Sequence, residues 1–224
     1  GFRTKNGSIR TPQSIQSYAT LATIIFQTNQ NEQHGGQSIP AFDFFMAKGV
    51  AKSFRKHLAS LISFYVNMGN GNQVNEKSIR TLIKEYLPSI KSSELERETL
   101  RISLAALQIN IDKEHLARTI DKAYQQTQKD THQAMEGFIH NLNTMHSRGG
   151  NQVVFSSINY GTDTSAEGRM VIEELLKATI EGLGTRGEVP VFPIQIFKVK
   201  DGVSYSEKDF EKATKTENFE EAMK

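Results

Sequence analysis

Cysteine is absent from all 224 residues of the sequence, and so is tryptophan. Without a thiol, these residues cannot form a disulfide, bind zinc through thiolates, or supply a cysteine nucleophile or a thiyl radical. The absence of tryptophan carries no functional message. Any chemistry that requires a thiol would therefore have to come from outside this sequence.

A charge excess of either sign is also missing. The 27 Lys and Arg residues are nearly balanced by 25 Asp and Glu residues, which leaves a formal net charge of +2. So small an excess argues against general binding of nucleic acid. No run approaches the roughly 18 apolar residues that cross a membrane, and no signal peptide opens the sequence. We therefore expect a cytoplasmic protein without a membrane partner.

The residues that are present are typical of a globular protein. Hydrophobic residues make up 37% of the sequence and charged residues 23%, and the length fits one to two domains of roughly 150 residues. The sequence starts at Gly1 rather than at Met, and it stops within a polar helical pattern. These features lead us to expect an internal fragment of a longer chain.

Helical periodicity dominates the first two thirds of the sequence. Apolar residues recur every three or four positions, and Thr, Ser and Pro stand where helices would begin. The pattern predicts helices near residues 12–31, 40–65, 76–87, 93–107 and 113–146. The last of these would be roughly 50 Å long at about 1.5 Å per residue. A rod of that length is often a scaffold or a subunit contact, so we expect it to take part in a homodimer.

The pattern changes after Arg148. Residues 153–158 are rich in β-branched and aromatic side chains and predict a strand, whereas residues 165–183 predict a helix that Ser165 can cap. Residues 189–199 are extended again. Strand, helix and strand in this order predict a parallel unit with a right-handed crossover. The expected fold class is therefore α/β.

Some candidate sites have a plain structural explanation. The six His residues show no tight ligand spacing, so no metal site is expected. Lys48, Lys52 and Lys56 recur every four residues and form a basic stripe on the predicted second helix. This stripe is either a solvated face or a seat for a polyphosphate, because several cations on one rigid face can share a highly charged anion.

Two loops that contain glycine are stronger candidates. Gly149 and Gly150 let the backbone approach a ligand closely, and the planar guanidinium of Arg148 suits a phosphate or a base edge. A plain turn is the alternative. Residues 161–165 follow a predicted parallel strand and precede a helix, where ligands bind in α/β folds because N–H groups and the helix dipole converge. Helix capping alone would also explain these residues.

Three blocks of the sequence resemble one known family. Residues 34–43 (HGGQSIPAFD), 143–170, which include SSINYGTDTSAEGRM, and 190–202 (PVFPIQIFKVKDG) are similar to segments of the anaerobic ribonucleoside-triphosphate reductases. The blocks stand in family order and span nearly the whole sequence. The match looks closest to phage versions of the large catalytic subunit. Three ordered blocks are far more specific than one short motif.

The resemblance implies part of a ten-stranded α/β barrel of the ribonucleotide reductase and glycyl-radical type, preceded by long helices. It implies an oxygen-sensitive enzyme that reduces ribonucleoside triphosphates to deoxyribonucleoside triphosphates, with formate as reductant and with dNTP or ATP as allosteric effectors. The glycyl radical and a zinc ion would lie outside these residues. An activase partner that carries an iron–sulfur cluster and uses S-adenosylmethionine would generate the radical.

The resemblance also divides the sequence and assigns sites. Within one catalytic domain, residues 1–146 would be a helical dimer and effector region, 147–202 a strand–helix–strand unit, and 203–224 a polar helical extension. No catalytic residue and no metal ligand is assigned within the segment. The assigned residues bind substrate (Asn159, Thr162, Asp163, Thr164, Ser165), contact effectors (Arg148, Gly149, Gly150, Gln152, Lys52, Lys56) or belong to a finger-loop segment (Ile194, Gln195, Ile196, Phe197).

Two other functions remain open from the sequence. A non-catalytic nucleotide-binding or assembly module derived from the same barrel would explain the absence of cysteine. A relative of the pyruvate formate-lyase group would share the barrel and the radical, but it is not expected to carry these three blocks. Half a closed barrel leaves strand edges unpaired, so we expect the segment to behave poorly in isolation.

Overall fold

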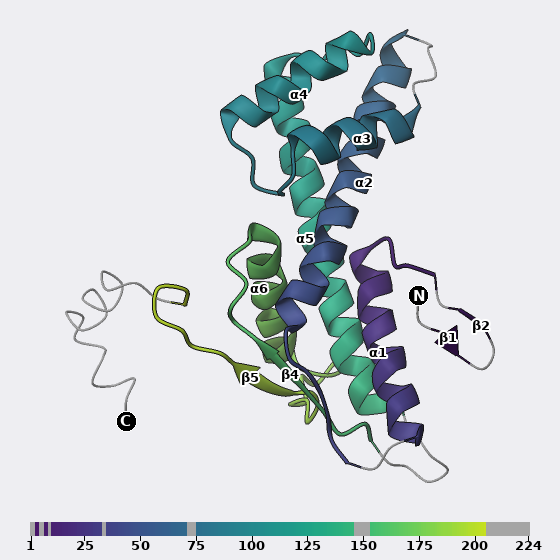
Figure 1. The fold of residues 1–224 in the computed structure, drawn as a ribbon, viewed down its shortest axis with the longest axis vertical. Coiled ribbons are helices and arrows are strands. Elements are labelled where there is room, and N and C mark those ends of the chain that lie inside the picture. The colour runs from purple at the N-terminus through teal and green to yellow at the C-terminus, as the bar shows by residue number, and fades with distance from the viewer. Residues whose placement is uncertain are drawn as a thin grey trace.

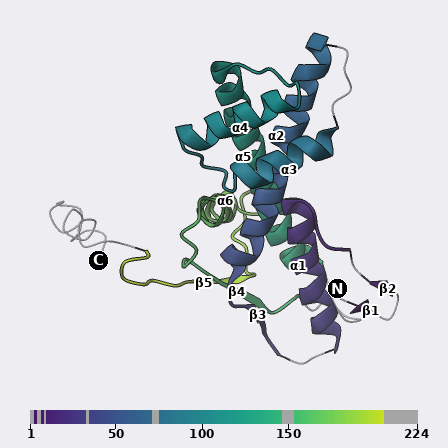
Figure 2. The same cartoon turned by 45° about the horizontal axis from the view of Figure 1, so that its top comes forward.

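Two long helices form the axis of the molecule. The computed structural model describes residues 3–4, 7–8, 10–32, 35–70, 75–145 and 153–204. Helices α2 (Phe42–Asn70) and α5 (Lys113–Thr144) pack along one another, and α1 (Ile15–Glu32) and α6 (Ala166–Glu181) pack against both (Figure 1). Two shorter helices, α3 (Glu76–Tyr86) and α4 (Glu94–Ala106), lie at one end of the pair, and a small sheet lies near the other (Figures 1 and 2).

The helices begin close to the predicted positions, and the predicted caps Ser93 and Ser165 are confirmed. All five helices predicted before Arg148 are confirmed with ends shifted by a few residues, and so is the helix predicted from residue 165. Ser93 and Glu96 form a complete capping box at the start of α4, which satisfies two backbone N–H groups that the helix itself leaves unpaired. Side chains that accept a hydrogen bond from a first-turn N–H also start α3, α5 and α6 (Asn75, Asp112, Ser165).

Aromatic side chains join α1, α2 and α5 in the core. The ring of Phe138 lies 5.0 Å from that of Phe42 and 6.3 Å from that of Phe26, measured between centroids, and all three side chains are buried. Burying a Phe side chain contributes about 1.5–3 kcal/mol. The apolar face of α5 is covered by α1, α2 and α6 of the same chain. The length of α5 therefore does not by itself require a second chain.

The sheet is parallel and contains a strand that the sequence did not predict. Strand β4 (Ser156–Tyr160) lies between β3 (Gln37–Ile39) and β5 (Ile194–Phe197), and both neighbours run parallel to it. The predicted parallel pairing of the strands on either side of α6 is therefore confirmed. Residues 37–39 were interpreted only as part of the break before a helix, because three residues between Gly36 and Pro40 are too few to show an alternating pattern.

The two faces of the sheet differ in character. Burial alternates along β4, with Ser156, Ile158 and Tyr160 buried, as expected for a strand with one face on a core, and α2 packs against this strand. The register places Ile194 and Ile196 of β5 beside Ser157 and Asn159, on the opposite face. These two Ile side chains are 57% and 44% exposed, so the opposite face is open within the described part of the chain.

The described residues confirm an α/β fold but contain only part of the predicted architecture. They hold three parallel strands and a small antiparallel pair, β1 (Arg3–Thr4) and β2 (Gly7–Ser8). The ten-stranded barrel remains a prediction, and most of the predicted extension at 203–224 lies outside the described residues. Among the helices that the structure describes, none combines the length and the apolar character needed to cross a membrane.

A buried carboxylate links α6 to α5. Glu174 accepts hydrogen bonds from Gln128 (2.8 Å) and Lys177 (3.0 Å), and it lies 3.1 Å from the ring of His132. Its side chain is only 4% exposed. Burial raises the pKa of Glu174, but the hydrogen bonds from Gln128 and Lys177 outweigh burial and leave the pKa below its ordinary value. The charged form is therefore the one that stabilises the fold.

We predict that Glu174→Gln lowers the free energy of unfolding by about 1–3 kcal/mol near neutral pH, because donors placed for a carboxylate lose their charged acceptor. A pKa depressed on folding adds stability above the unfolded value of about 4.3 and loses it as the pH falls through the folded value. The difference in the free energy of unfolding between the variant and the wild type should therefore shrink as the pH falls through these pKa values. Denaturant unfolding followed by circular dichroism measures this free energy. The control is Glu173→Gln, which changes a half-exposed neighbour and should alter the free energy of unfolding little. Equal effects of the two variants would contradict the assignment.

Candidate functional site

The three sequence blocks that resemble the reductases meet at one edge of the sheet. Because β3, β4 and β5 are parallel, their carboxyl ends lie together, which is where α/β folds bind ligands. The backbone N–H of Lys198, just after β5, donates to Tyr160 O at 2.7 Å. The ammonium of Lys198 donates to Pro40 O, just after β3, at 2.8 Å. This edge is the candidate site.

A buried aspartate from the first block organises this edge. Asp43 lies in the first turn of α2 and is 0% exposed. Its Oδ2 atom accepts the backbone N–H groups of three consecutive residues after β4, at 2.9, 3.1 and 3.0 Å (Gly161, Thr162, Asp163). Its Oδ1 atom accepts the N–H of Phe44 at 3.0 Å. Successive N–H groups that converge in this way form an anion-binding concavity, and here the anion is a side chain of the same chain.

The loop after β4 is held from within as well. Asp163 is buried, and its Oδ1 atom accepts the N–H of Ser165 at 2.8 Å. The hydroxyl of Ser165 accepts the N–H of Gly168 at 3.0 Å and caps α6. Of the five residues assigned to substrate, these two therefore use their side chains to shape the loop. Capping and ligand binding were alternatives for this loop, and capping accounts for these two side chains.

The other three assigned residues present polar groups at the same edge. Asn159 lies on the open face of β4, and its amide donates to Ser38 Oγ at 3.0 Å. Thr162 is half-buried and Thr164 is exposed. The structure thus brings all five assigned residues together at one end of β4.

Two glycines allow the loop to pack this closely. Gly161 has a φ of +112°, and a Cβ atom there would lie 2.7 Å from Lys198 O. A Cβ atom on Gly168 would lie 2.3 Å from Cγ of Asp163. Side chains larger than hydrogen would therefore push the loop away from β5 or displace the carboxylate of Asp163.

The residues assigned to effector binding are only partly described. Arg148, Gly149, Gly150 and Gln152 lie outside the described residues. Lys52 donates to Pro12 O at 2.8 Å and lies 5.3 Å from the ring centroid of Tyr18, so its ammonium holds the start of α1 against α2. Lys56 is exposed. The stripe on α2 is therefore part structural anchor and part solvated face.

The residues assigned to a finger-loop segment form a regular strand in the described part of the chain, and their assignment to a finger loop stays a prediction. Ile194–Phe197 is strand β5, hydrogen-bonded along β4. The carboxamide of Gln195 accepts from the hydroxyl of Tyr160 at 2.8 Å and donates to Thr179 Oγ1 at 2.7 Å. Burial raises the pKa of the Tyr160 hydroxyl, which keeps it a donor. The alternation of apolar residues in this segment is explained by a sheet strand with one open face.

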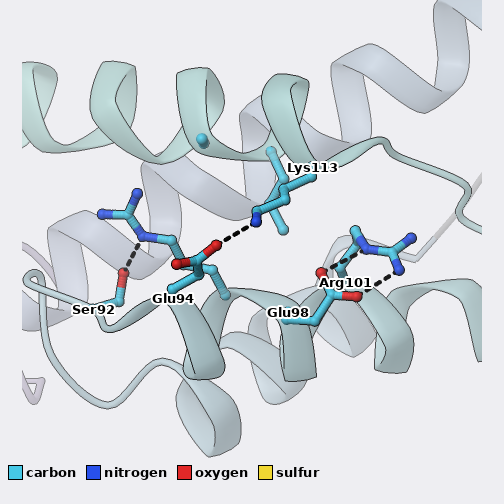
Figure 3. A pocket seen from close by; sticks show the side chains of 8 residues that line it. Ser92, Glu94, Glu98, Arg101 and Lys113 are labelled. Atoms are coloured by element: carbon cyan, nitrogen blue, oxygen red, sulfur yellow. Dashed lines mark hydrogen bonds and ion pairs between the residues drawn. The ribbon is translucent and has the colours of Figure 1, made fainter.

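A hollow lies far from the sheet, between α4 and the start of α5. It encloses about 350 Å³, and Figure 3 shows its charged lining. Lys113 pairs with Glu94, Arg101 pairs with Glu98 at 2.6 Å, and Arg97 donates to Ser92 at 2.9 Å. The hydrogen bond from Lys113 lowers the pKa of Glu94. Because its charges compensate one another, the hollow is better explained as a contact between helices than as a catalytic centre.

Sequence reasoning missed the roles of Asp43, Lys198 and Ser38. Asp43 and Ser38 belong to the first block and Lys198 to the third, but no local pattern shows that these blocks meet. The described residues hold no group of three His, Asp or Glu side chains that could bind a metal ion. The edge offers hydrogen-bonding groups and the ammonium of Lys198 on a rigid support, which suits binding and orienting a polar ligand.

We predict opposite effects for two helical glycines. Gly168→Ala should destabilise the protein by about 1–3 kcal/mol, because the new methyl group displaces the Asp163 carboxylate from the loop. Gly137→Ala in α5 meets no atom within 4 Å and should stabilise it by up to about 1 kcal/mol through helix propensity. Thermal unfolding of both variants measures the contrast. Stabilisation by both would show that Asp163 does not depend on the space at Gly168.

Comparison with known proteins agrees with the convergence of the three blocks. Residues 1–224 match the family model described as anaerobic ribonucleoside-triphosphate reductase. The chain is 23% identical over 209 residues to the enzyme of that name from Enterobacteria phage T4, and 25% identical over 209 residues to that from Escherichia coli K12. These alignments cover 93% of this chain but only 26% and 22% of the two relatives, so the chain spans about a quarter of their length. The chain belongs to the anaerobic ribonucleoside-triphosphate reductase family.

Proposed function

We propose that this chain is a segment of the catalytic subunit of an oxygen-sensitive reductase that converts ribonucleoside triphosphates to deoxyribonucleoside triphosphates. The observation that supports this most directly is the convergence of all three family blocks at the carboxyl edge of the sheet. There Asp43 holds the loop after β4, and Lys198 joins the ends of β3 and β5. Family membership supports this kind of enzyme, and we propose the edge as the place where its substrate binds.

We propose further that the sheet is one sector of the ten-stranded barrel. In such a barrel, helices cover the outside and the inner face of the strands surrounds the active site. Here α2 packs on one face of β4, and Ser38, Asn159 and Ile196 occupy the other. Strands from elsewhere in the complete chain would pair with the outer edges of β3 and β5. The open face would then line the interior and shield reactive intermediates from solvent.

The substrate would bind at the carboxyl edge, where some of the five assigned residues would contact it and the others would hold the loop in place. Asn159, Thr162 and Thr164 would donate or accept hydrogen bonds to the nucleotide. Asp163 and Ser165 would act indirectly, since their side chains bond the backbone of the loop and of α6. Polar groups held by such a rigid support orient a ligand at little entropic cost.

The radical machinery would come from outside this sequence. With no cysteine among 224 residues, the segment cannot hold a thiyl radical or bind zinc through thiolates, so neither fits the residues present. The proposal therefore places the sulfur chemistry, the zinc ion and the glycyl radical elsewhere in the complete chain. Formate would serve as reductant, and an activase with an iron–sulfur cluster and S-adenosylmethionine would generate the radical. The role that we propose for this segment is to bind and orient the substrate and to enclose it away from solvent.

Effector control and a homodimer belong to the same proposal. Arg148, Gly149, Gly150 and Gln152 would relay effector identity to the substrate edge, since residues 146–152 connect α5 to the segment that enters β4. The exposed Lys56 would attract effector phosphates, whereas Lys52 would support α1. The exposed sides of α2 and α5 would form the dimer contact.

A non-catalytic nucleotide-binding or assembly module is the second candidate, and the absence of cysteine favours it. The encoding reading frame separates the two candidates. Flanking cysteine codons and a downstream glycine-radical motif support the enzyme, whereas stop codons on both sides support the module.

We predict that the complete protein, incubated without oxygen with its activase, S-adenosylmethionine and formate, forms deoxyribonucleoside triphosphates. A glycyl radical should be visible by electron paramagnetic resonance. Product formation is measured by chromatography of the nucleotides, with omission of the activase as control. A radical-bearing protein that binds ribonucleoside triphosphates without reducing them would contradict the proposed activity.

We predict that Arg148→Ala in the complete enzyme changes which nucleotide is reduced under a given effector, because the guanidinium would no longer relay effector binding. Competition among the four substrates under each effector measures this. Arg186→Ala is a matched control, because Arg186, like Arg148, precedes a glycine in the sequence, and it is exposed. If Arg148→Ala keeps the wild-type preference under every effector, the loop is not the relay.

A further inference from the structure

We infer that Asp43 is a positioning residue for the substrate: its carboxylate fixes the backbone of residues 161–163 and thereby sets where the nucleotide-binding side chains stand. This inference rests on the proposed function and adds a residue to which the family resemblance assigned no role. Asp43 does not reach the open face of the sheet. It would act through the loop that it holds.

The carboxylate of Asp43 is satisfied by backbone groups alone. It is 0% exposed and accepts four N–H groups, three of them from the loop after β4. Among the described residues, no Lys, Arg or His lies within salt-bridge distance of it. A buried charge without such partners is costly. The loop therefore has one favoured arrangement, in which all three N–H groups point at Oδ2.

The support on which Asp43 stands is rigid. Its neighbour Phe42 and the residues one and two turns further along α2, Met46 and Val50, are all 0% exposed. The hydrogen bond from Lys198 to Pro40 ties the turn before α2 to the end of β5. Asp43 consequently cannot follow the loop if the loop moves. Instead, the loop is held in register with α2 and with the ends of both outer strands.

The same contacts restrict how a nucleotide can bind. Converging N–H groups are an attractive place for a phosphate, but the N–H groups of residues 161–163 are already occupied by Asp43. Substrate phosphates must therefore use other donors at this edge, such as the hydroxyls of Thr162 and Thr164, which are half-buried and exposed. A change at Asp43 weakens the hold on the loop, so it should weaken productive binding of substrate.

The test uses the complete enzyme activated by its activase, with Asp43→Asn as the main variant. Asn can accept fewer of the four N–H groups, and we expect KM for the ribonucleoside triphosphate to rise about tenfold, the size of one weakened charge-assisted hydrogen bond. The glycyl radical content should stay at the wild-type level, because radical formation does not use this loop. A merely structural defect would lower radical content and activity together.

Two further variants make the outcome decisive. Glu174→Gln removes another buried carboxylate and should reduce thermal stability while leaving KM unchanged. Asp43→Glu keeps the charge but shifts it by one methylene group, so its KM should lie between those of the wild type and Asp43→Asn. If Asp43→Asn does not fold, Asp43→Glu decides the matter through a rise of about threefold.

The outcomes separate the inference from the proposed function. A folded Asp43→Asn or Asp43→Glu with wild-type KM, in an enzyme whose wild type is active, overturns the positioning role alone. A wild-type enzyme that carries the radical but makes no deoxyribonucleotide overturns the proposed function on which the inference rests. A raised KM with normal radical content supports both.

Discussion

The architecture of the sheet edge depends on one buried anion with backbone partners. A carboxylate inside a protein must be compensated, and Asp43 is compensated by N–H groups of a loop 118 to 120 residues away in sequence. This requirement fixes the loop after β4, and the loop in turn fixes the start of α6. The glycine at 161 and the glycine at 168 follow from the same constraint, because each leaves room for an atom that the arrangement brings close. One side chain thus accounts for much of the second sequence block.

The long helices give this arrangement its rigidity. Helix α2 carries Asp43 at one end and contacts α3 at the other, and it packs along α5 on the way. The aromatic contacts of Phe42, Phe26 and Phe138 join three helices directly behind the sheet edge. Glu174 adds a polar connection between α5 and α6. The candidate site therefore rests on a helical core rather than on isolated loops.

Much of the local structure could be predicted from the sequence, whereas contacts between distant segments could not. Apolar periodicity and capping residues were enough to predict the helices. Ser93 and Ser165, for example, cap the starts of α4 and α6. Strand β3 was missed because three residues carry no pattern of their own and become a strand only through β4. Lys52 was expected on an exposed basic stripe. In the structure its ammonium donates to Pro12 O and lies over the ring of Tyr18. The spacing of the lysines on α2 does not show that the segment before α1 and α1 itself pack there. The role of Asp43 was hidden for the same reason, although the family resemblance did mark its block.

The position of β3 in the sheet has a consequence for how the chain acquires its fold. Ser38 of β3 pairs with Ser157 of β4, so this pairing cannot form until β4 has been synthesised. Helical segments with local contacts form quickly, whereas pairings between remote residues form slowly. During synthesis, α1, α2 and α5 can therefore assemble first and keep residues 37–39 in place as a template. The arrival of β4 then gives β3 its partner and Asp43 its N–H groups, and β5 joins the sheet afterwards.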